Sequence, residues 1–118
     1  MSCCPPLNIE IMIEIKDKND WKKLQESGKP FLLDFYADWC GPCQALLPIL
    51  DHLSEKHGAE VTIAKVNVDK NQELAGAFGV RSIPTVFAFQ NGEVVDFFQG
   101  LQPPAFVENK IEQLKLAS

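Results

Sequence analysis

The stretch Phe31-Leu32-Leu33-Asp34-Phe35-Tyr36-Ala37-Asp38-Trp39-Cys40-Gly41-Pro42-Cys43 decides the fold. It begins with an almost continuously apolar run, which predicts a central strand that is buried on both faces. Two cysteines follow at a spacing of three, and a helical pattern extends from them to about His57. The sequence therefore predicts a buried strand, a short turn, and a helix whose first turn carries a cysteine pair.

The rest of the chain alternates between strand and helix patterns. The predicted elements are a strand at 9–15, a helix at 18–27 capped by Asp17 or Asn19, a strand at 61–68, a short helix capped by Asn71, strands at 85–90 and 94–98, and a last helix from Pro103-Pro104. Asn91-Gly92 between the last two strands is a strong hairpin signal. Strands that are separated by helices predict parallel pairing, and the hairpin adds an antiparallel edge. The expected class is α/β.

Length and composition narrow the class of protein further. The 118 residues suit one domain, and 46% hydrophobic and 23% charged residues are close to globular averages. A net charge of −5 argues against a nucleic-acid surface. No apolar run approaches the ~20 residues that span a bilayer, and no signal peptide is visible. We expect a flexible tail at residues 1–8 and a single domain at 9–118, without nucleic-acid or membrane partners.

The cysteine pair is the most informative feature of the chain. Cys40 is expected at a helix N-terminus, where free N–H groups and the helix dipole favour a thiolate, the form that attacks disulfides. Cys43 lies on the same helical face and within bridging reach, so it can resolve a mixed disulfide formed at Cys40. Pro42 stiffens the turn between the cysteines, and Gly41 allows a partner to approach closely. The pattern predicts a redox pair.

Half of a zinc site is the alternative interpretation of this pair. Zinc takes about four ligands, usually from two such pairs or from histidines at set spacings. Cys3-Cys4 has the wrong spacing, and His52 and His57 are interpreted as solvated or packed helix residues. No metal site is therefore expected.

Several segments beyond the cysteine pair match a known family in order. They are Asp34 to Cys43, Ala64-Lys65-Val66-Asn67-Val68-Asp69, Gly79-Val80-Arg81-Ser82-Ile83-Pro84-Thr85, Asn91-Gly92 and Gly100. With these segments, residues 8–118 resemble the thioredoxin family. The resemblance implies a thioredoxin fold, with a central mixed sheet of four or five strands flanked by helices on both faces. It also implies an enzyme that reduces disulfide bonds in target proteins.

Asp34 is unusual because a carboxylate in so apolar a strand is costly to bury, and burial raises its pKa. It is either a hydrogen-bonded core residue or the proton acceptor for Cys43. The resemblance implies the second role and places Lys65 nearby, where its charge would tune Asp34. Lys65 is otherwise a lysine that reaches solvent from a strand edge.

The resemblance also implies a substrate-binding surface. Its residues are Trp39, Gly41, Pro42, Ile83, Pro84 and Gly100. An X–Pro bond is trans in most proteins, so the residues alone predict a trans bond before Pro84. The resemblance instead implies a cis bond that faces the cysteines and turns the Ile83 backbone toward a bound peptide. Trp39 is either part of an apolar docking surface or a core residue.

The resemblance implies no bound cofactor, because a separate thioredoxin reductase would restore the dithiol. The chain has no G-x-G-x-x-G motif, so we expect electrons to arrive by protein contact. A cytoplasmic monomer is expected. A disulfide oxidase or isomerase is one alternative, which the family resemblance disfavours because Gly41-Pro42 separates the cysteines. A binding module without turnover is another.

Three features depart from the commonest pattern of the family. Gln44 stands where a lysine is frequent, which removes a positive charge near the thiols. Tyr36 stands where bacterial members often have tryptophan. Cys3-Cys4 adds two thiols whose Cα atoms, ~3.8 Å apart across a trans peptide, would strain an internal disulfide.

Overall fold

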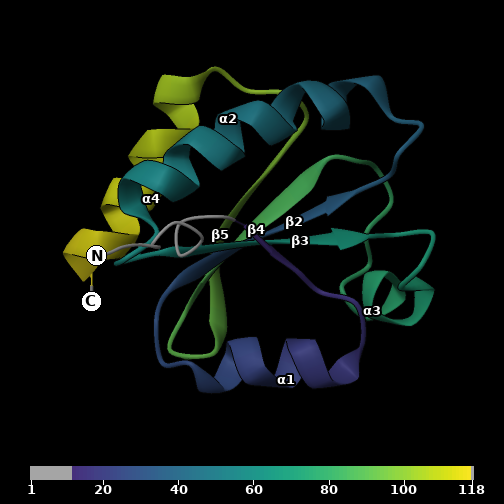
Figure 1. Cartoon of the computed structure of the whole chain (residues 1–118), viewed down its shortest axis with the longest axis horizontal. Coiled ribbons are helices and arrows are strands. Elements are labelled where there is room, and N and C mark those ends of the chain that lie inside the picture. Colours follow the sequence, from purple (N-terminus) through teal and green to yellow (C-terminus); the bar gives the residue numbers. More distant parts are fainter. Residues whose placement is uncertain (1–11, 118) are drawn as a thin grey trace, which may run out of the picture.

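In the computed structural model, which describes residues 12–117, five strands form one sheet with helices on both faces (Figure 1). The elements are β1 (Ile13–Glu14), α1 (Lys18–Glu26), β2 (Phe31–Tyr36), α2 (Gly41–His57), β3 (Thr62–Asn67), α3 (Gln72–Ala77), β4 (Thr85–Gln90), β5 (Glu93–Gln99) and α4 (Pro104–Ala117). The fold class predicted from the sequence is confirmed. The proposed tail at 1–8, Cys3-Cys4 and the start of the 9–15 strand lie outside the described residues.

The sheet has the strand order β1-β3-β2-β4-β5, so the strand that precedes the cysteines is its centre. β1 and β2 both run parallel to β3, as expected for strands joined through helices. The expectation was wrong for β4, which follows α3 and yet runs antiparallel to β2. α3 has only six residues and lies beyond the carboxyl end of β3, so it does not carry the chain back across the sheet (Figure 1).

Two local signals in the sequence acted as predicted. Asp17 caps α1 by accepting a hydrogen bond of 3.0 Å from the Asp20 N–H. Asn91 and Gly92 have φ values of 55° and 80°, the left-handed pair that a tight hairpin turn requires. Asn71 precedes α3 but does not cap it with its side chain, because its amide donates to the carbonyls of Ile15 and Asn67 instead.

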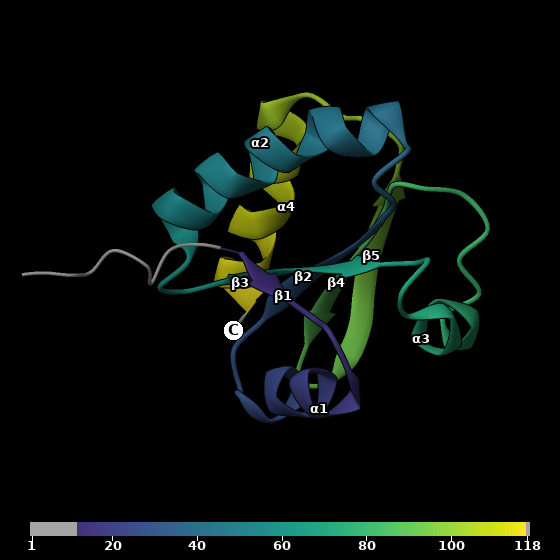
Figure 2. The ribbon, with the colours of Figure 1, turned by 45° about the vertical axis from the view of Figure 1, so that its right-hand side comes forward.

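The two faces of the sheet bury different sets of side chains. On β2, Phe31, Leu33 and Phe35 pack in the cluster beneath α1 and α3. Leu32 packs in the other cluster, with residues of α2 and α4. These two helices lie on the opposite side of the sheet from α1 (Figure 2). Because successive strand residues point to opposite faces, Asp34 must point toward α2.

Candidate active site

The cysteine pair forms the first turn of α2. Cys40 is the N-cap residue, and its sulfur accepts a hydrogen bond of 3.2 Å from the Cys43 N–H. The two residues form a disulfide with their Cα atoms 5.2 Å apart. Cys40 is 6% exposed and Cys43 is completely buried. Cys40 is therefore the more accessible of the two cysteines, and it lies where helix N–H groups favour a thiolate.

The turn between β2 and α2 is held by the carbonyl of Ala37. This oxygen accepts one hydrogen bond from the Cys40 N–H and a second from the Gln44 side-chain amide, both of 3.2 Å. Pro42 fits in the first helical turn because the N–H that it lacks would have had no partner there. Gln44, which replaces a frequent lysine of the family, thus ties the helix to the turn.

The loop before β4 forms the second wall of the site. The Ile83–Pro84 peptide bond is cis, as the family resemblance implied and the residues alone did not. The Ile83 carbonyl oxygen lies 3.8 Å from the Cys40 sulfur. The Gly100 N–H donates a 2.8 Å hydrogen bond to the Pro84 carbonyl, which brings the end of β5 to the same place. Ile83, Pro84 and Gly100 therefore gather beside Cys40.

The surface around the pair is open and partly apolar. Trp39 is 71% exposed, so core packing does not explain it. Its indole N–H donates a 2.9 Å hydrogen bond to Asp69, a partner that the sequence reasoning missed. Gly41 and Pro42 are also exposed, and a side chain added at Gly41 would point into open space. The Trp39 ring and the exposed helix start form a surface on which another chain can dock.

Asp34 is completely buried on the face that α2 covers. On this face of β2 it lies between Leu32, which packs under α2, and Tyr36, which clusters with Cys40 and Cys43. Neither carboxylate oxygen of Asp34 has a hydrogen-bond partner among the described residues. Burial raises the pKa of this carboxyl to about 7, and the charge of Lys65 lowers it by less. Asp34 can therefore gain or lose a proton near neutral pH.

Lys65 lies beside Asp34 in the strand register but forms its ion pair elsewhere. The register of β2 and β3 pairs Asp34 with Lys65. The Lys65 ammonium lies 3.6 Å from a Glu14 oxygen and 5.6 Å from the centre of the Tyr36 ring. The Tyr36 hydroxyl donates a 2.9 Å hydrogen bond to the other Glu14 oxygen. Sequence reasoning missed Glu14, because only the pairing of β1 with β3 brings it here.

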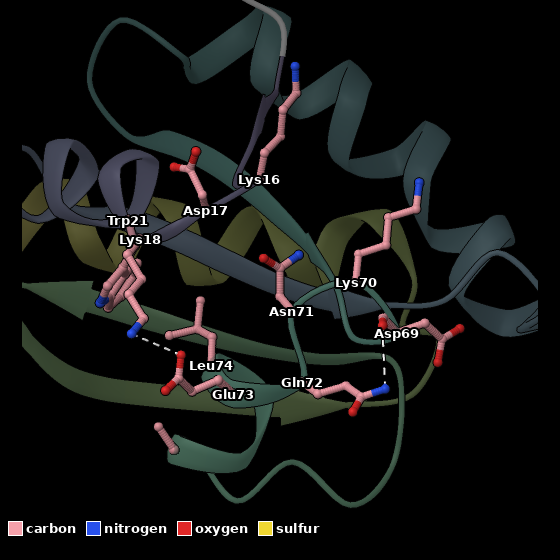
Figure 3. A pocket seen from close by; sticks show the side chains of 11 residues that line it. Lys16, Asp17, Lys18, Trp21, Asp69, Lys70, Asn71, Gln72, Glu73 and Leu74 are labelled. Atoms are coloured by element: carbon pink, nitrogen blue, oxygen red, sulfur yellow. Dashed lines mark hydrogen bonds and ion pairs between the residues drawn. The ribbon is translucent and has the colours of Figure 1, made fainter.

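A pocket of about 710 Å³ lies between the start of α1 and α3 (Figure 3). Charged and polar side chains such as Lys16, Lys70 and Gln72 line it. Asp69, one of its lining residues, accepts the hydrogen bond from the Trp39 indole. The pocket contains none of the groups that exchange disulfides.

A second cluster of possible ligands joins α2 to α4. His57, Glu108 and Glu112 offer donor atoms within 4.8 Å of one another. The Lys56 ammonium lies 2.7 Å from Glu108, however, and the Lys115 ammonium lies 3.1 Å from the His57 Nδ1 atom. Two ammonium groups oppose a bound cation, so the cluster is explained by ion pairing between helices.

These features define a class of protein, a dithiol–disulfide oxidoreductase with a cysteine pair at a helix N-terminus and a cis-proline opposite. A family model described as Thioredoxin matches residues 11–113. The chain belongs to the thioredoxin family, whose members are protein-disulfide reductases that act on disulfide-containing substrates.

Individual relatives support this assignment. The chain is 41% identical over 100 residues to a thioredoxin of Chlorobaculum thiosulfatiphilum, covering 85% of this chain and 93% of the relative. It is 42% identical over 102 residues to a thioredoxin of Haemophilus influenzae, covering 86% and 95%. A solved mutant thioredoxin from Halobacterium salinarum superposes with a TM-score of 0.84 at 35% identity, covering 94% and 96% of the two chains.

The helices offer no candidate for a membrane span. Within residues 12–117, none is both long and apolar enough to cross a bilayer.

Proposed function

We propose that Cys40 is the nucleophile and Cys43 the resolving thiol in the reduction of target disulfides. The Cys40 thiolate attacks one sulfur of the target, which forms a mixed disulfide and releases the first target thiolate. Cys43 then gives up its proton and attacks the Cys40 sulfur, and the second target thiolate leaves. Two electrons pass to the target, and the Cys40–Cys43 disulfide remains. Cys40 keeps 6% of its surface exposed and Cys43 none, which supports this order of attack.

Asp34 is the proton acceptor for Cys43 in this proposal. Its carboxyl lies on the sheet face that α2 covers and has no hydrogen-bond partner among the described residues. A pKa of about 7 suits a group that must take up a proton near neutral pH. Lys65 tunes Asp34, because its positive charge favours the carboxylate and limits the rise in pKa. The unpartnered, buried carboxyl on the sheet face that α2 covers is the observation that carries the assignment.

The target docks across the exposed start of α2 and the loop before β4. Trp39, Gly41 and Pro42 supply the exposed side of this surface. Ile83, Pro84 and Gly100 supply the other side, where an extended peptide can pair with the backbone beside the cis bond. A target held there places its disulfide near Cys40.

Each turnover leaves an oxidised cysteine pair, so a reductant must restore the dithiol. We infer that a separate thioredoxin reductase supplies these two electrons through protein contact. The family assignment supports this partner, and a monomer in a reducing cytoplasm suits the cycle. The net charge of −5 gives no support to a nucleic-acid partner.

Trapping the mixed disulfide tests the proposed roles of the cysteines. With Cys43→Ser, the reduced protein should form a stable adduct with a disulfide-bonded protein substrate, and peptide mass should locate the bond at Cys40. Cys40→Ser is the matched control and should form no adduct at Cys43. An adduct at Cys43 in that control, or normal turnover by Cys43→Ser, would contradict the mechanism. Mapping by peptide keeps adducts at Cys3 and Cys4 separate.

The reduction potential tests the direction of exchange. The pair is equilibrated in graded thiol buffers, alkylated, and quantified by peptide mass. A potential below the cytosolic glutathione poise of about −220 to −260 mV supports a reductase. A potential near the ~−120 mV of a strong oxidase would mean that the pair donates disulfides.

A further inference from the structure

Glu14, Lys65 and Asp34 form one row across three neighbouring strands. The register pairs Glu14 of β1 with Lys65 of β3, and Lys65 with Asp34 of β2. Residues paired in this way point to the same face of the sheet, here the face that α2 covers. The row therefore places one ammonium between two carboxyl groups, an outer one on Glu14 and an inner one on Asp34.

Lys65 is bound to the outer carboxylate of this row. Its Nζ atom lies 3.6 Å from the Glu14 Oε1 atom, and the Tyr36 hydroxyl donates to the Oε2 atom at 2.9 Å. The Lys65 ammonium also lies over the Tyr36 ring, 5.6 Å from its centre. The Glu14 carboxylate thus has a partner for each oxygen, whereas the buried Asp34 carboxyl has none among the described residues.

The surroundings of Asp34 contain few groups that could replace Lys65. On β4 its register partner is the apolar Val86. At the start of α2, Cys40 and Cys43 cluster with Tyr36, the next residue of β2 on this face. The residues of α4 that pack over the face, Val107, Ile111 and Leu114, are apolar. The charge of Lys65 acts on Asp34, and Glu14 lies on the far side of Lys65 in the row.

We propose that Glu14 is a positioning residue for disulfide reduction, which holds the Lys65 ammonium toward β1 and so leaves the Asp34 carboxyl able to take up the Cys43 proton. This inference rests on the proposed role of Asp34. An ammonium that turned to Asp34 would stabilise its carboxylate and weaken its hold on a proton. Glu14 prevents that turn by its charge, and Tyr36 fixes the Glu14 carboxylate by donating to it.

The ionisation of Asp34 reads this effect directly. The carboxyl carbon is titrated by NMR in the oxidised protein, where Cys40 and Cys43 cannot titrate. The variants are Glu14→Gln, which keeps an oxygen for the Tyr36 hydroxyl but removes the charge, Lys65→Met, and the double variant. Glu93→Gln is the matched control, because it removes one exposed charge from the opposite edge strand.

Glu14→Gln should lower the titration midpoint of Asp34 by about one pH unit, because the freed ammonium approaches the carboxylate. Lys65→Met should raise the midpoint, and adding Glu14→Gln in that background should cause no further shift. Glu93→Gln should leave the midpoint unchanged. An unmoved midpoint in Glu14→Gln would overturn the inference. An equal fall in the Lys65→Met background would overturn it too, because Glu14 would then act by its field alone.

The pH profile of the resolving step links this titration to catalysis. Release of the second target thiol is followed in single turnovers, and Glu14→Gln should move the rising limb of the profile to lower pH by the same amount. If Asp34→Asn changes the pH profile but Glu14→Gln does not, this inference is overturned and the proposed role of Asp34 stands. A profile that ignores Asp34→Asn would overturn both the inference and the proposed role of Asp34.

Discussion

Buried polar groups near the two ends of α2 differ in whether they have hydrogen-bond partners. Beneath its N-terminal end, the Asp34 carboxyl is completely buried and has no hydrogen-bond partner among the described residues. At its C-terminal end, His57 is only 4% exposed, and yet its ring lies 2.7 Å from Glu108 and 3.1 Å from Lys115. Burying a polar group without a partner costs free energy, whereas hydrogen bonds offset much of that cost for a paired group. The unpaired carboxyl near the first end is the proton acceptor that we propose, and the paired groups at the second end join α2 to α4.

The largest effect should come from replacing the Cys40 sulfur at the N-terminal end of α2. Cys40→Ser should reduce turnover with a disulfide-bonded protein by at least ~1,000-fold, because a hydroxyl at this position cannot form the mixed disulfide. The rate is measured with dithiothreitol as reductant, and the uncatalysed rate is subtracted. His57→Ala at the other end is the matched control. Comparable losses of turnover in both variants would show that the two ends of α2 do not differ in their importance for catalysis.

Asp34→Asn tests the proton acceptor beneath the same end. It should slow the resolving step by about 100-fold, the lower part of the range for general base catalysis. Attack by Cys40 should change little, so the mixed disulfide should accumulate in rapid-quench samples. If both steps slowed equally, Asp34 would act on the site as a whole and not on the Cys43 proton.

The stability of an Asp34→Ala variant should show what the buried carboxyl costs. Its pKa is about 7 in the folded protein against 3.8 for the free group, so the folded state holds the proton more tightly. Folding therefore weakens as pH rises from about 4 to 7, by about 4 kcal/mol in total. Asp34→Ala should remove this loss and raise the free energy of unfolding at pH 8 by about 2–4 kcal/mol, after a cavity cost. Urea unfolding should show little gain at pH 4, and an equal gain at both pH values would contradict the assignment.

The sequence predicted the structure around the N-terminal end of α2 well, because the signals for it are local. The apolar run of β2, the cysteine spacing and the helix start lie within the stretch from Phe31 to Cys43, and all three were confirmed. The buried position of Asp34 followed from its apolar neighbours. The cis bond at Pro84 was different, because the residues alone favoured trans and only the family resemblance indicated cis.

The sequence said little about the paired groups, because their partners are distant along the chain. His57 was assigned no role, and its partner Glu108 lies 51 residues away on another helix. Glu14 meets Lys65 only because β1 adds to the sheet beside β3. The antiparallel direction of β4 was also missed, since the order of elements does not show that α3 is too short to return across the sheet. Long-range pairing depends on tertiary packing, which the local pattern does not encode.

Trp39→Ala should reduce activity less than Cys40→Ser and Asp34→Asn do, because we expect it to weaken substrate docking more than the chemical steps. The ring is 71% exposed, so its loss should change stability little. We expect kcat/KM for a protein substrate to fall by about 10-fold, through a loss of apolar contact worth about 1.4 kcal/mol. Reduction of a small aromatic disulfide, which needs no docking surface, is the control reaction and should change less than twofold.

His57→Ala should have the smallest effect on activity, because His57 lies at the end of α2 opposite to Cys40. The substitution removes a partner of Glu108. The Lys56 and His57 side chains together lower the pKa of Glu108 to about 2, and the imidazole is the buried member of the cluster. Its loss should lower the free energy of unfolding by about 2 kcal/mol, from lost hydrogen bonding and packing. Turnover at 25 °C and the Asp34 titration should match the parent protein. A His57→Ala protein that stayed folded but lost more than about threefold in turnover would show that the two ends of α2 are coupled, and that pairing with α4 helps to position Cys40.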